Sequence, residues 1–441
     1  MTLSFMVTQV ESRVSNVATK QTGRFKLPEW LDEDFLQLCM QRGENDPTIR
    51  VLKHSVTIGS ISSYPNAVST YRVSVEFKRR PRSRNILDFK PQEVRSLIIK
   101  VMNHDNQDSK SLDTIYLIEK EIELLSKTIP AIHKIVSMEY PQSGIQQFTS
   151  HCIYSELQPR PLIVVEDLHN LGYCIASPKG HRGLDLEHST MVMRVLATFH
   201  AGSIAIYEKD PSSMKHYEAN VWNKQNESLV KDFIELTVKD VADEVATWPG
   251  YGEKYSAKIR GLRKNLLSRV NAAVTRDPES FNVLVHGDLW FNNILFKYDM
   301  TGTGISDLMF VNFSNARYSS PVIDLQHFLF SSPVDEVRSK NYTRLLRVYY
   351  ESLVYVMGKF KVNTKPPTFE ELTKEMTKRG SYGILIAFIL LPIVLGEKTL
   401  NHNFLNNPDV IKSRRKFYST ENYRSALKRL LPIFEERGLF D

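Results

Sequence analysis

Residues 283–296 read VLVHGDLWFNNILF, and this stretch decides which fold the chain can adopt. An apolar run ends in the turn His286-Gly287-Asp288, and Asn293 follows five residues after the aspartate. The spacing predicts a loop that leaves a strand end and enters a short hairpin. A phosphoryl-transfer site needs this pattern, because a carboxylate must accept the hydroxyl proton and an amide oxygen must help to hold magnesium. Taken alone, the motif is also compatible with a chance aspartate in a turn.

The end of the following strand departs from that pattern. Residues 309–316 read MFVNFSNA, and Asn312 stands where a second magnesium-binding carboxylate is expected. Asp307 cannot replace it, because five steps of extended strand at about 3.3 Å each put the two residues roughly 16 Å apart. The sequence therefore predicts a site that keeps its shape at this corner but lacks one negative charge.

A lysine upstream fits the same chemistry. Lys100 is the only charged residue of the segment LIIKVM (97–102), and a lysine in a buried strand is costly unless it is paired. Kinases use such a strand lysine on the α- and β-phosphates and orient it with a helix glutamate. Glu121 lies 21 residues later in a predicted helix, and Glu119 is the competing candidate on another face of that helix. A lysine on an edge strand that reaches water is the alternative.

The rest of the chain falls into a part with strands and a part with helices. We expect helices over 28–39 and 114–130, and strands over 49–58, 71–77, 95–102, 134–140 and 161–168. After Gly172 the pattern is helical, except for a β island at 283–313. The chain thus divides into a loose tail at 1–26, a sheet-rich N-lobe at 27–166 and a large helical C-lobe at 167–441.

Composition and charge place the chain among soluble globular proteins. Its 441 residues are 42% hydrophobic and 24% charged, with a net charge of +7, which suits a nucleotide without demanding nucleic acid. Three scattered cysteines, Cys39, Cys152 and Cys174, do not make a disulfide framework. No signal-peptide pattern is visible, and the apolar run at 384–395 is too short to span a bilayer. We expect a cytoplasmic monomer with neither a nucleic-acid nor a membrane partner.

Four segments together resemble the ecdysteroid-kinase-like family, within the choline kinase and aminoglycoside phosphotransferase clan. Besides residues 283–296 they are IVVEDLHNLGY (163–173), LDLEHSTMVMRVLATFHA (184–201) and ARYSSPVIDL (316–325). The resemblance runs from about Trp30 to the C-terminus. It implies an α+β, bilobal protein-kinase-like fold with a small antiparallel-sheet N-lobe and a large helical C-lobe. It also implies transfer of the γ-phosphoryl group of ATP to a hydroxyl of a small apolar molecule, a steroid among the possible acceptors.

The resemblance also implies a role for each site residue. Asp288 is the catalytic base, and Asn293 and Asn312 are the metal ligands for Mg²⁺. In the nucleotide site Lys100 holds the phosphates, Glu121 orients it, and Glu166 and Leu168 belong to the hinge beside the adenine. Asp324 is a buried brace of the catalytic loop.

Two departures from the family pattern leave a second interpretation open. Asn312-Phe313-Ser314 stands where the family has Asp-Phe-Gln, which weakens the magnesium site. The phosphate-covering turn at 62–73 contains no glycine and includes Pro65, which has no N–H to donate. The alternative to a working kinase is therefore a catalytically impaired pseudokinase that binds a ligand or a protein.

Three other features have two interpretations each. The basic segment KRRPRSR (78–84) is either a solvated hairpin loop or a recognition segment, namely a nuclear-import signal or a binding site for an acidic partner. Trp222, Trp248 and Tyr251 either line an acceptor pocket or pack helices. We interpret His200 as a packed, hydrogen-bonded histidine rather than a ligand.

Overall fold

The computed structural model describes residues 28–58, 68–80, 92–102, 112–145, 147–176, 183–218, 227–302, 304–396 and 415–441. The chain forms two compact units, each described here by itself. The sheet unit comprises the described residues within Glu11–Lys127 and Thr149–Cys174, and the helical unit those within Thr128–Phe148 and Ile175–Asp441. The boundary falls within the short strand β6 (Cys174–Ile175), and the predicted cut after residue 166 stays a prediction.

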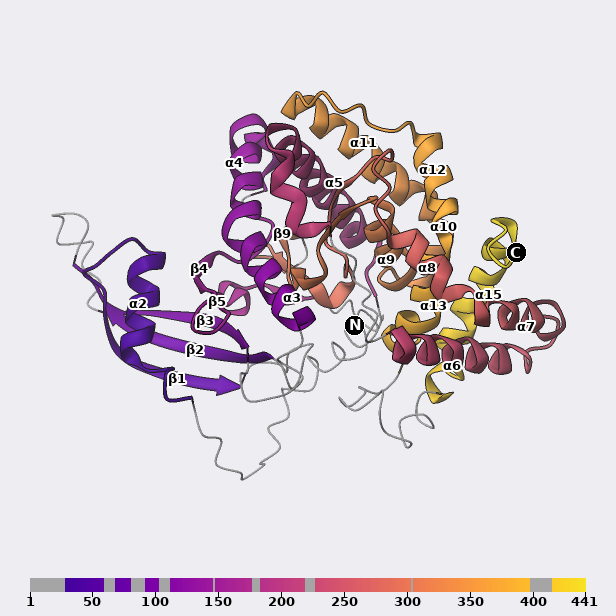
Figure 1. Ribbon diagram of the computed structural model, residues 1–441, viewed down its shortest axis with the longest axis horizontal. Coiled ribbons are helices and arrows are strands. Elements are labelled where there is room, and N and C mark those ends of the chain that lie inside the picture. Colours follow the sequence, from indigo (N-terminus) through magenta and orange to yellow (C-terminus); the bar gives the residue numbers. More distant parts are fainter. Residues whose placement is uncertain are drawn as a thin grey trace. The chain divides into compact units, whose positions relative to one another are not determined.

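The sheet unit is built on one five-stranded sheet with the order β1-β2-β3-β5-β4 (Figure 1). Every neighbouring pair in it is antiparallel. Its strands are β1 (Arg50–Ile58), β2 (Val68–Lys78), β3 (Glu93–Met102), β4 (Cys152–Glu156) and β5 (Leu162–Glu166). Four of the five predicted strands correspond to these, namely those at 49–58, 71–77, 95–102 and 161–168.

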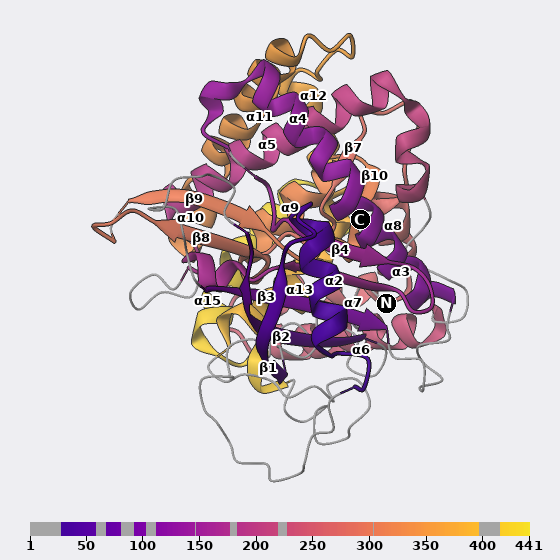
Figure 2. The same cartoon turned by 90° about the vertical axis from the view of Figure 1, so that its left-hand side faces the viewer.

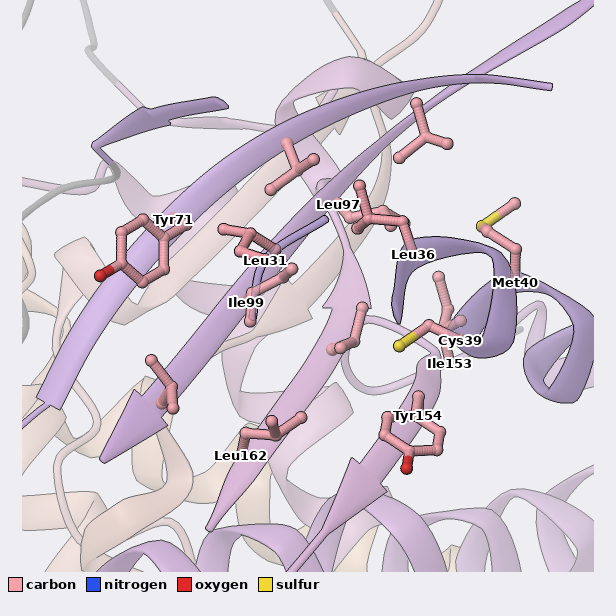
Figure 3. Close-up of a cluster of buried hydrophobic side chains, with 14 of the residues drawn as sticks. Leu31, Leu36, Cys39, Met40, Tyr71, Leu97, Ile99, Ile153, Tyr154 and Leu162 are labelled. Carbon is pink, nitrogen blue, oxygen red and sulfur yellow. The ribbon is translucent and has the colours of Figure 1, made fainter. Parts of the chain in front are cut away.

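One face of this sheet forms the core of the unit (Figure 3). Alternation along β2 puts Tyr71, Val73, Val75 and Phe77 on the buried face, as the period-2 pattern predicts. Helix α2 (Glu33–Gly43) covers that face with three buried side chains: Leu36, Cys39 and Met40. Its N-terminus is capped by Asp32, so it begins later than the predicted residue 28.

The predicted strand at 134–140 is wrong. Helix α3 (Leu112–Glu123) passes through a π-helical turn, η4 (Leu124–Thr128), into a second helix, α4 (Ile129–Glu139), which belongs to the helical unit. Pro130 lies in the first turn of α4, where its missing N–H would have had no helical partner, so it does not stop the helix. Ile132, Ile135 and Val136 share the buried helical face. The fifth strand is β4, which the sequence pattern did not reveal.

The helical unit contains two helical groups around short strands. Before the strands come α5 (Leu186–Lys209), α6 (Glu227–Val245), α7 (Gly252–Gly261) and α8 (Leu266–Val274). After them come α9 (Val322–Ser331), α10 (Asp335–Lys340), α11 (Tyr342–Phe360), α12 (Phe369–Lys378), α13 (Gly380–Leu395) and α15 (Glu421–Glu436). The strands are β7 (Val283–Val285), β8 (Ile294–Tyr298), β9 (Ile305–Phe310) and β10 (Arg317–Ser319); the β8–β9 hairpin is prominent in Figure 2. The predicted β island is therefore present. The fold class is confirmed as protein-kinase-like, with an antiparallel sheet followed by a helical region.

Two helices of this unit are strongly apolar. All 16 residues of α13 are buried, including Pro392. By length and composition α5 could cross a membrane, but 78% of its most apolar window is buried within the fold, where it packs against α11. The pair α12 and α13 passes the same test only if counted as one span, and it is bent by 59°.

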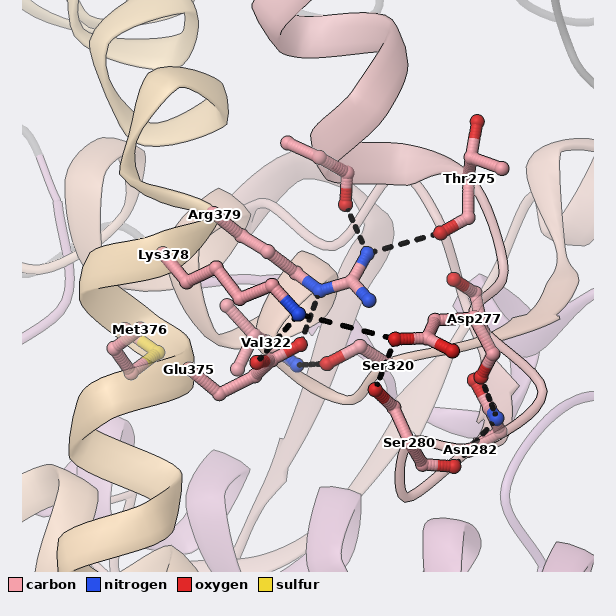
Figure 4. Close-up of polar contacts among 12 residues, drawn as sticks. Thr275, Asp277, Ser280, Asn282, Ser320, Val322, Glu375, Met376, Lys378 and Arg379 are labelled. Carbon is pink, nitrogen blue, oxygen red and sulfur yellow. Dashed lines mark hydrogen bonds and ion pairs between the residues drawn. The ribbon is translucent and has the colours of Figure 1, made fainter.

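A polar cluster fixes the approach to β7, the strand before the HGD turn (Figure 4). The buried Arg379 donates to the carbonyls of Ala273 and Thr275, which closes the C-terminal end of α8. Asn282 then donates to the backbone carbonyls of Asp277 and Ser280. The turn between α8 and β7 is thus held from both sides, so the position of β7 is well defined.

Candidate active site

The sheet unit brings together the predicted lysine and its glutamate. Lys100 Nζ lies 2.8 Å from Glu121 Oε1, between β3 and α3. Glu121 is buried, whereas Glu119 is exposed, so the pair is made with the first candidate. Backbone register puts Leu97, Ile99 and Val101 in the core, and Lys100 therefore points to the other face of the strand.

The hinge segment after β5 belongs to the same unit. Glu166 is the last residue of β5 and lies opposite Leu97, while Leu168 is buried in the short 3-10 helix η6 (Leu168–Leu171). Asp167 between them accepts hydrogen bonds from Ser96 Oγ at 2.8 Å and from the N–H of His169, and pairs with Arg72 Nε at 2.8 Å. The middle residue therefore fixes the hinge to strands β2 and β3, a role that its sequence position did not indicate.

In the helical unit a buried carboxylate holds the catalytic loop. Asp324 on α9 accepts the backbone N–H of His286 at 2.6 Å and of Gly287 at 2.8 Å. Its Oδ2 also lies 3.2 Å from His200 Nε2, whose Nδ1 bonds Tyr349 at 2.8 Å. Burial alone would raise the pKa of Asp324, but these contacts hold it below its usual value. Asp324 is thus an ionised brace, and His200 is packed and hydrogen-bonded as expected.

The loop also depends on a glycine. Gly287 has a φ of 79°, and a Cβ there would lie 2.2 Å from the carbonyl oxygen of Asn315. Only glycine allows the loop before β8 and the turn after β9 to approach each other this closely. The glycine of the HGD motif is therefore required by backbone packing, independently of any catalytic role.

Asp288 lies at the centre of this loop and is fully buried. Asn293, in the 3-10 turn η9 (Phe291–Asn293), donates its amide to the backbone oxygen of Asp288 at 2.8 Å and to its Oδ2 at 3.0 Å. Burial raises the pKa of Asp288 to about 7, an effect that the Asn293 hydrogen bond opposes. A carboxyl group with a pKa near neutrality can both accept and release a proton, as a general base must.

Asn312 joins Asn293 and Asp288 through a side-chain hydrogen bond that the sequence did not reveal. Its Nδ2 donates to Asn293 Oδ1 at 2.8 Å. The backbone supports this approach, since the N–H of Val311 donates to the carbonyl of Asn293 at 3.0 Å. Asn312 has a φ of 66°, a left-handed conformation that asparagine and aspartate tolerate better than most residues. The structure thus connects Asn312, Asn293 and Asp288 in one chain of hydrogen bonds.

Comparison with known proteins identifies the family of the chain. The profile of the family described as "Ecdysteroid kinase-like family" matches residues 67–362, which is more than half of the chain. The chain belongs to the ecdysteroid kinase-like family. No curated protein matches it. The resemblance noted from the sequence is therefore confirmed at the level of the family, a family of ATP-dependent small-molecule kinases.

Several solved structures are similar to this chain at low sequence identity. Spectinomycin phosphotransferase APH(9)-Ia, in complex with ADP and spectinomycin, is 12% identical with a TM-score of 0.44, covering 90% of this chain and 98% of its own. The amicoumacin kinase hAmiN, in complex with AMP-PNP, Ca²⁺ and Ami, is 12% identical with a TM-score of 0.38, covering 84% and 88%. A choline/ethanolamine kinase family protein from Mesorhizobium loti is 10% identical with a TM-score of 0.28, covering 80% and 88%.

The amides of this ecdysteroid kinase-like chain do not form a tight magnesium site as they are arranged. Magnesium prefers carboxylate oxygens and water in octahedral geometry. Asn293 donates its NH₂ to Asp288, so its Oδ1 faces Asn312. Asn312 donates its own NH₂ to that oxygen and therefore presents no oxygen of its own there. Among the described residues no group of three or more His, Cys, Asp or Glu side chains could hold a metal ion. Magnesium on Asn293 and Asn312 therefore stays a prediction.

Three buried residues beside Asp288 were absent from the sequence-based site. His327 Nε2 on α9 lies 3.3 Å from Asp288 Oδ1, and its Nδ1 lies 2.9 Å from the hydroxyl of Tyr382 on α13. Arg317 on β10 is also buried and interacts electrostatically with Asp288, Asp324 and Tyr382. No motif spacing connects these residues, because they come from three elements that only the tertiary fold brings together.

Other predictions fall partly outside the described residues. Residues 62–67 of the phosphate-covering turn, with Pro65, lie outside them, as do 81–84 of the basic segment and Trp222. Trp248 is described and buried, with its indole N–H donating to Glu244 at 3.0 Å. Tyr251 packs its ring against Tyr255. These contacts favour helix packing over an acceptor pocket for these two aromatic residues.

Proposed function

We propose that this chain transfers the γ-phosphoryl group of ATP to a hydroxyl of a small apolar molecule, with a hydroxylated steroid as the first class to test. The observation that carries the proposal is the assembled Lys100–Glu121 pair at 2.8 Å. A buried glutamate that fixes a strand lysine is what a kinase uses to hold the α- and β-phosphates of its nucleotide. The acceptor class is supported by the family to which the chain belongs.

In this reaction the acceptor oxygen forms the new bond to the γ-phosphorus, and the bond to the bridging oxygen of ADP breaks. The hydroxyl proton passes to the carboxylate of Asp288. A pKa raised by burial to about 7 makes that carboxylate basic enough to take the proton near neutral pH. The buried Asp324 keeps the loop that carries Asp288 in place.

A second function is favoured by one specific contact. The hydrogen bond from Asn312 to Asn293 uses an oxygen that a kinase site presents to magnesium. A protein with this arrangement can bind a nucleotide or another ligand through the sheet unit without useful turnover. This pseudokinase function would retain the Lys100–Glu121 pair and lose only the transfer step.

The two functions are separated by measuring nucleotide binding and turnover on the same preparation. ATP-induced thermal stabilisation and ADP release should be followed with a panel of hydroxylated steroids, using the parent chain, Lys100→Met and Asp288→Asn. For the kinase we expect stabilisation and turnover in the parent, loss of both in Lys100→Met, and loss of turnover alone in Asp288→Asn. Stabilisation without turnover supports the pseudokinase. Absence of ATP stabilisation in the parent refutes the kinase and any pseudokinase that binds ATP.

A further inference from the structure

The second oxygen of Asp288 faces a histidine that the proposed reaction does not yet use. Asn293 bonds Oδ2, while Oδ1 lies 3.3 Å from His327 Nε2. Both Oδ1 and Nε2 are fully buried, and neither has a hydrogen-bond partner. A buried carboxylate oxygen without a partner is costly, and so is a buried ring nitrogen. Among the described residues, these two atoms are positioned to satisfy each other.

The ring proton of His327 can be placed by elimination. Burial lowers the pKa of His327 to about 3, so the ring is neutral near pH 7 and carries one proton. Its Nδ1 lies 2.9 Å from the hydroxyl of Tyr382, which burial keeps protonated by raising its pKa. If Tyr382 donates to Nδ1, the ring proton lies on Nε2 and points at Asp288. Against the ionised carboxylate, which is the form that acts as the base, the opposite tautomer would set a nitrogen lone pair, and that is repulsive.

The surroundings argue against a charged His327. Burial has the largest effect on the pKa of His327; Asp324 raises that pKa, whereas His286 and Arg317 lower it, and the net shift is downward. Arg317 is buried in the same region. Arg317 also supplies the positive charge that offsets the ionised Asp324 and the Asp288 carboxylate. His327 is therefore a neutral donor of a hydrogen bond, and the pair with Asp288 is not an ion pair.

We infer that His327, oriented by Tyr382, is the positioning residue that fixes the Asp288 carboxylate for phosphoryl transfer. This inference rests on the proposed function for the role of Asp288. Held by Asn293 at Oδ2 and by His327 at Oδ1, the carboxylate cannot rotate. One acceptor position then remains on each oxygen for the hydroxyl of the acceptor. The three supporting residues come from η9, α9 and α13, which are rigid elements, so the base is oriented before substrate binds.

The kinetic test compares His327→Leu with His327→Gln. Leucine removes the donor, whereas the amide of glutamine can place an N–H near the position of Nε2. We expect kcat to fall by about 100-fold in His327→Leu with the KM for ATP unchanged, since misplacement of a catalytic group by about 1 Å has effects of that size. His327→Gln should recover most of the loss, and Tyr382→Phe should lie between the two. Equal loss in Leu and Gln, or full activity in Leu, overturns the inference.

The chain offers a matched control. His188 is also buried and also lies between an aspartate and a tyrosine, with Nδ1 2.8 Å from Asp185 and Nε2 2.9 Å from Tyr298. The contacts of His188 do not include Asp288. His188→Gln should therefore leave kcat unchanged even if it lowers stability. A fall in kcat equal to that of His327→Leu would mean that the effect is one of folding.

A second measurement does not depend on turnover. In the full chain, ring ¹⁵N shifts should show His327 as the Nε2–H tautomer, with a low-field proton that moves in Asp288→Asn and disappears in His327→Gln. The Nδ1–H tautomer, or a proton indifferent to Asp288→Asn, refutes the positioning role even if the protein is an active kinase. If the tautomer is found but no acceptor is phosphorylated, the proposed function fails while the Asp288–His327 geometry stands.

Discussion

Asn312→Asp tests how the missing charge affects this site. Asn312 Nδ2 donates to Asn293 Oδ1 at 2.8 Å, and Asn293 cannot turn because its own NH₂ is directed to Asp288. An aspartate at 312 would place a carboxylate oxygen against the amide oxygen of Asn293. Without a cation, Asn293 Oδ1 loses its donor and faces a carboxylate oxygen instead, and an acceptor left without a partner in a part-buried site costs about 2 kcal/mol. In a chain of 441 residues that corresponds to a fall of roughly 2 °C in melting temperature.

A divalent cation should turn the loss of stability in Asn312→Asp into a gain. Magnesium, if held by residues 293 and 312, would offset the repulsion between their oxygens, and a carboxylate binds magnesium more strongly than a neutral amide does. We therefore expect Asn312→Asp to be less stable than the parent in EDTA, and to gain more from magnesium and ATP than the parent gains. If the parent has weak turnover, the variant should exceed it by about 10²–10³-fold, the usual effect of one preorganised electrostatic group.

The assay is a melting series in EDTA, magnesium, ATP and magnesium with ATP, followed by ADP release. Asn312→Gly is the control, because glycine accepts the φ of 66° and removes the amide without adding charge. It should lose stability in EDTA and gain nothing from magnesium. An Asn312→Asp variant that melts like the parent in EDTA, or that responds to magnesium no more than Asn312→Gly does, refutes the reasoning.

Three further predictions concern buried polar contacts, two of them at the candidate site. Glu121→Gln should weaken ATP binding by about tenfold, because a charge-assisted bond to the lysine is lost, while Glu119→Gln on the exposed face should leave the ATP-induced melting shift unchanged. Asp324→Asn should lower the free energy of unfolding by about 3–5 kcal/mol in denaturant titrations, since it breaks the buried brace. His133 accepts the N–H of Phe148 at 2.6 Å, and burial lowers its pKa from 6.5 to about 4. Because the unfolded state binds the proton more readily, up to about 3 kcal/mol of the free energy of unfolding should be lost as pH falls from 6.5 to 4, and none below pH 4. His133→Gln should flatten that pH dependence in denaturant titrations.

The sequence predicted those parts of the fold in which local pattern and tertiary burial agree. The alternation of β2 and the lone lysine of β3 are local features, and the structure buries or pairs those side chains accordingly. The prediction failed at 134–140, because the chain does not leave the helix at residue 130: Pro130 lies in the first turn of α4. Strand β4 (Cys152–Glu156) was not predicted, since five residues of mixed polarity carry little periodic signal.

The site divides in a similar way. The candidates Asp288, Asn293 and Asn312 are close in sequence and follow strand ends, so their meeting was predictable from spacing. The contact of His327 with Asp288 was not predictable, because His327 lies within an apolar helix and reaches Asp288 only through the packing of α9 against the loop. The direction of the Asn312 amide was also beyond the sequence, since it depends on which way Asn293 is turned by Asp288.

The wholly buried helix α13 has a practical consequence for these experiments. Its residues include an uninterrupted apolar run, ILIAFILLPIVL (384–395), with no polar face to keep it soluble once the fold opens. Heat-unfolded chains that expose such a segment associate faster than they refold. Melting of this protein should then be irreversible and should depend on the heating rate, so the measured temperature reflects the rate of unfolding. Variants are best ranked at a single scan rate and dilution, and a light-scattering rise that coincides with the unfolding transition would identify the exposed helix as the cause.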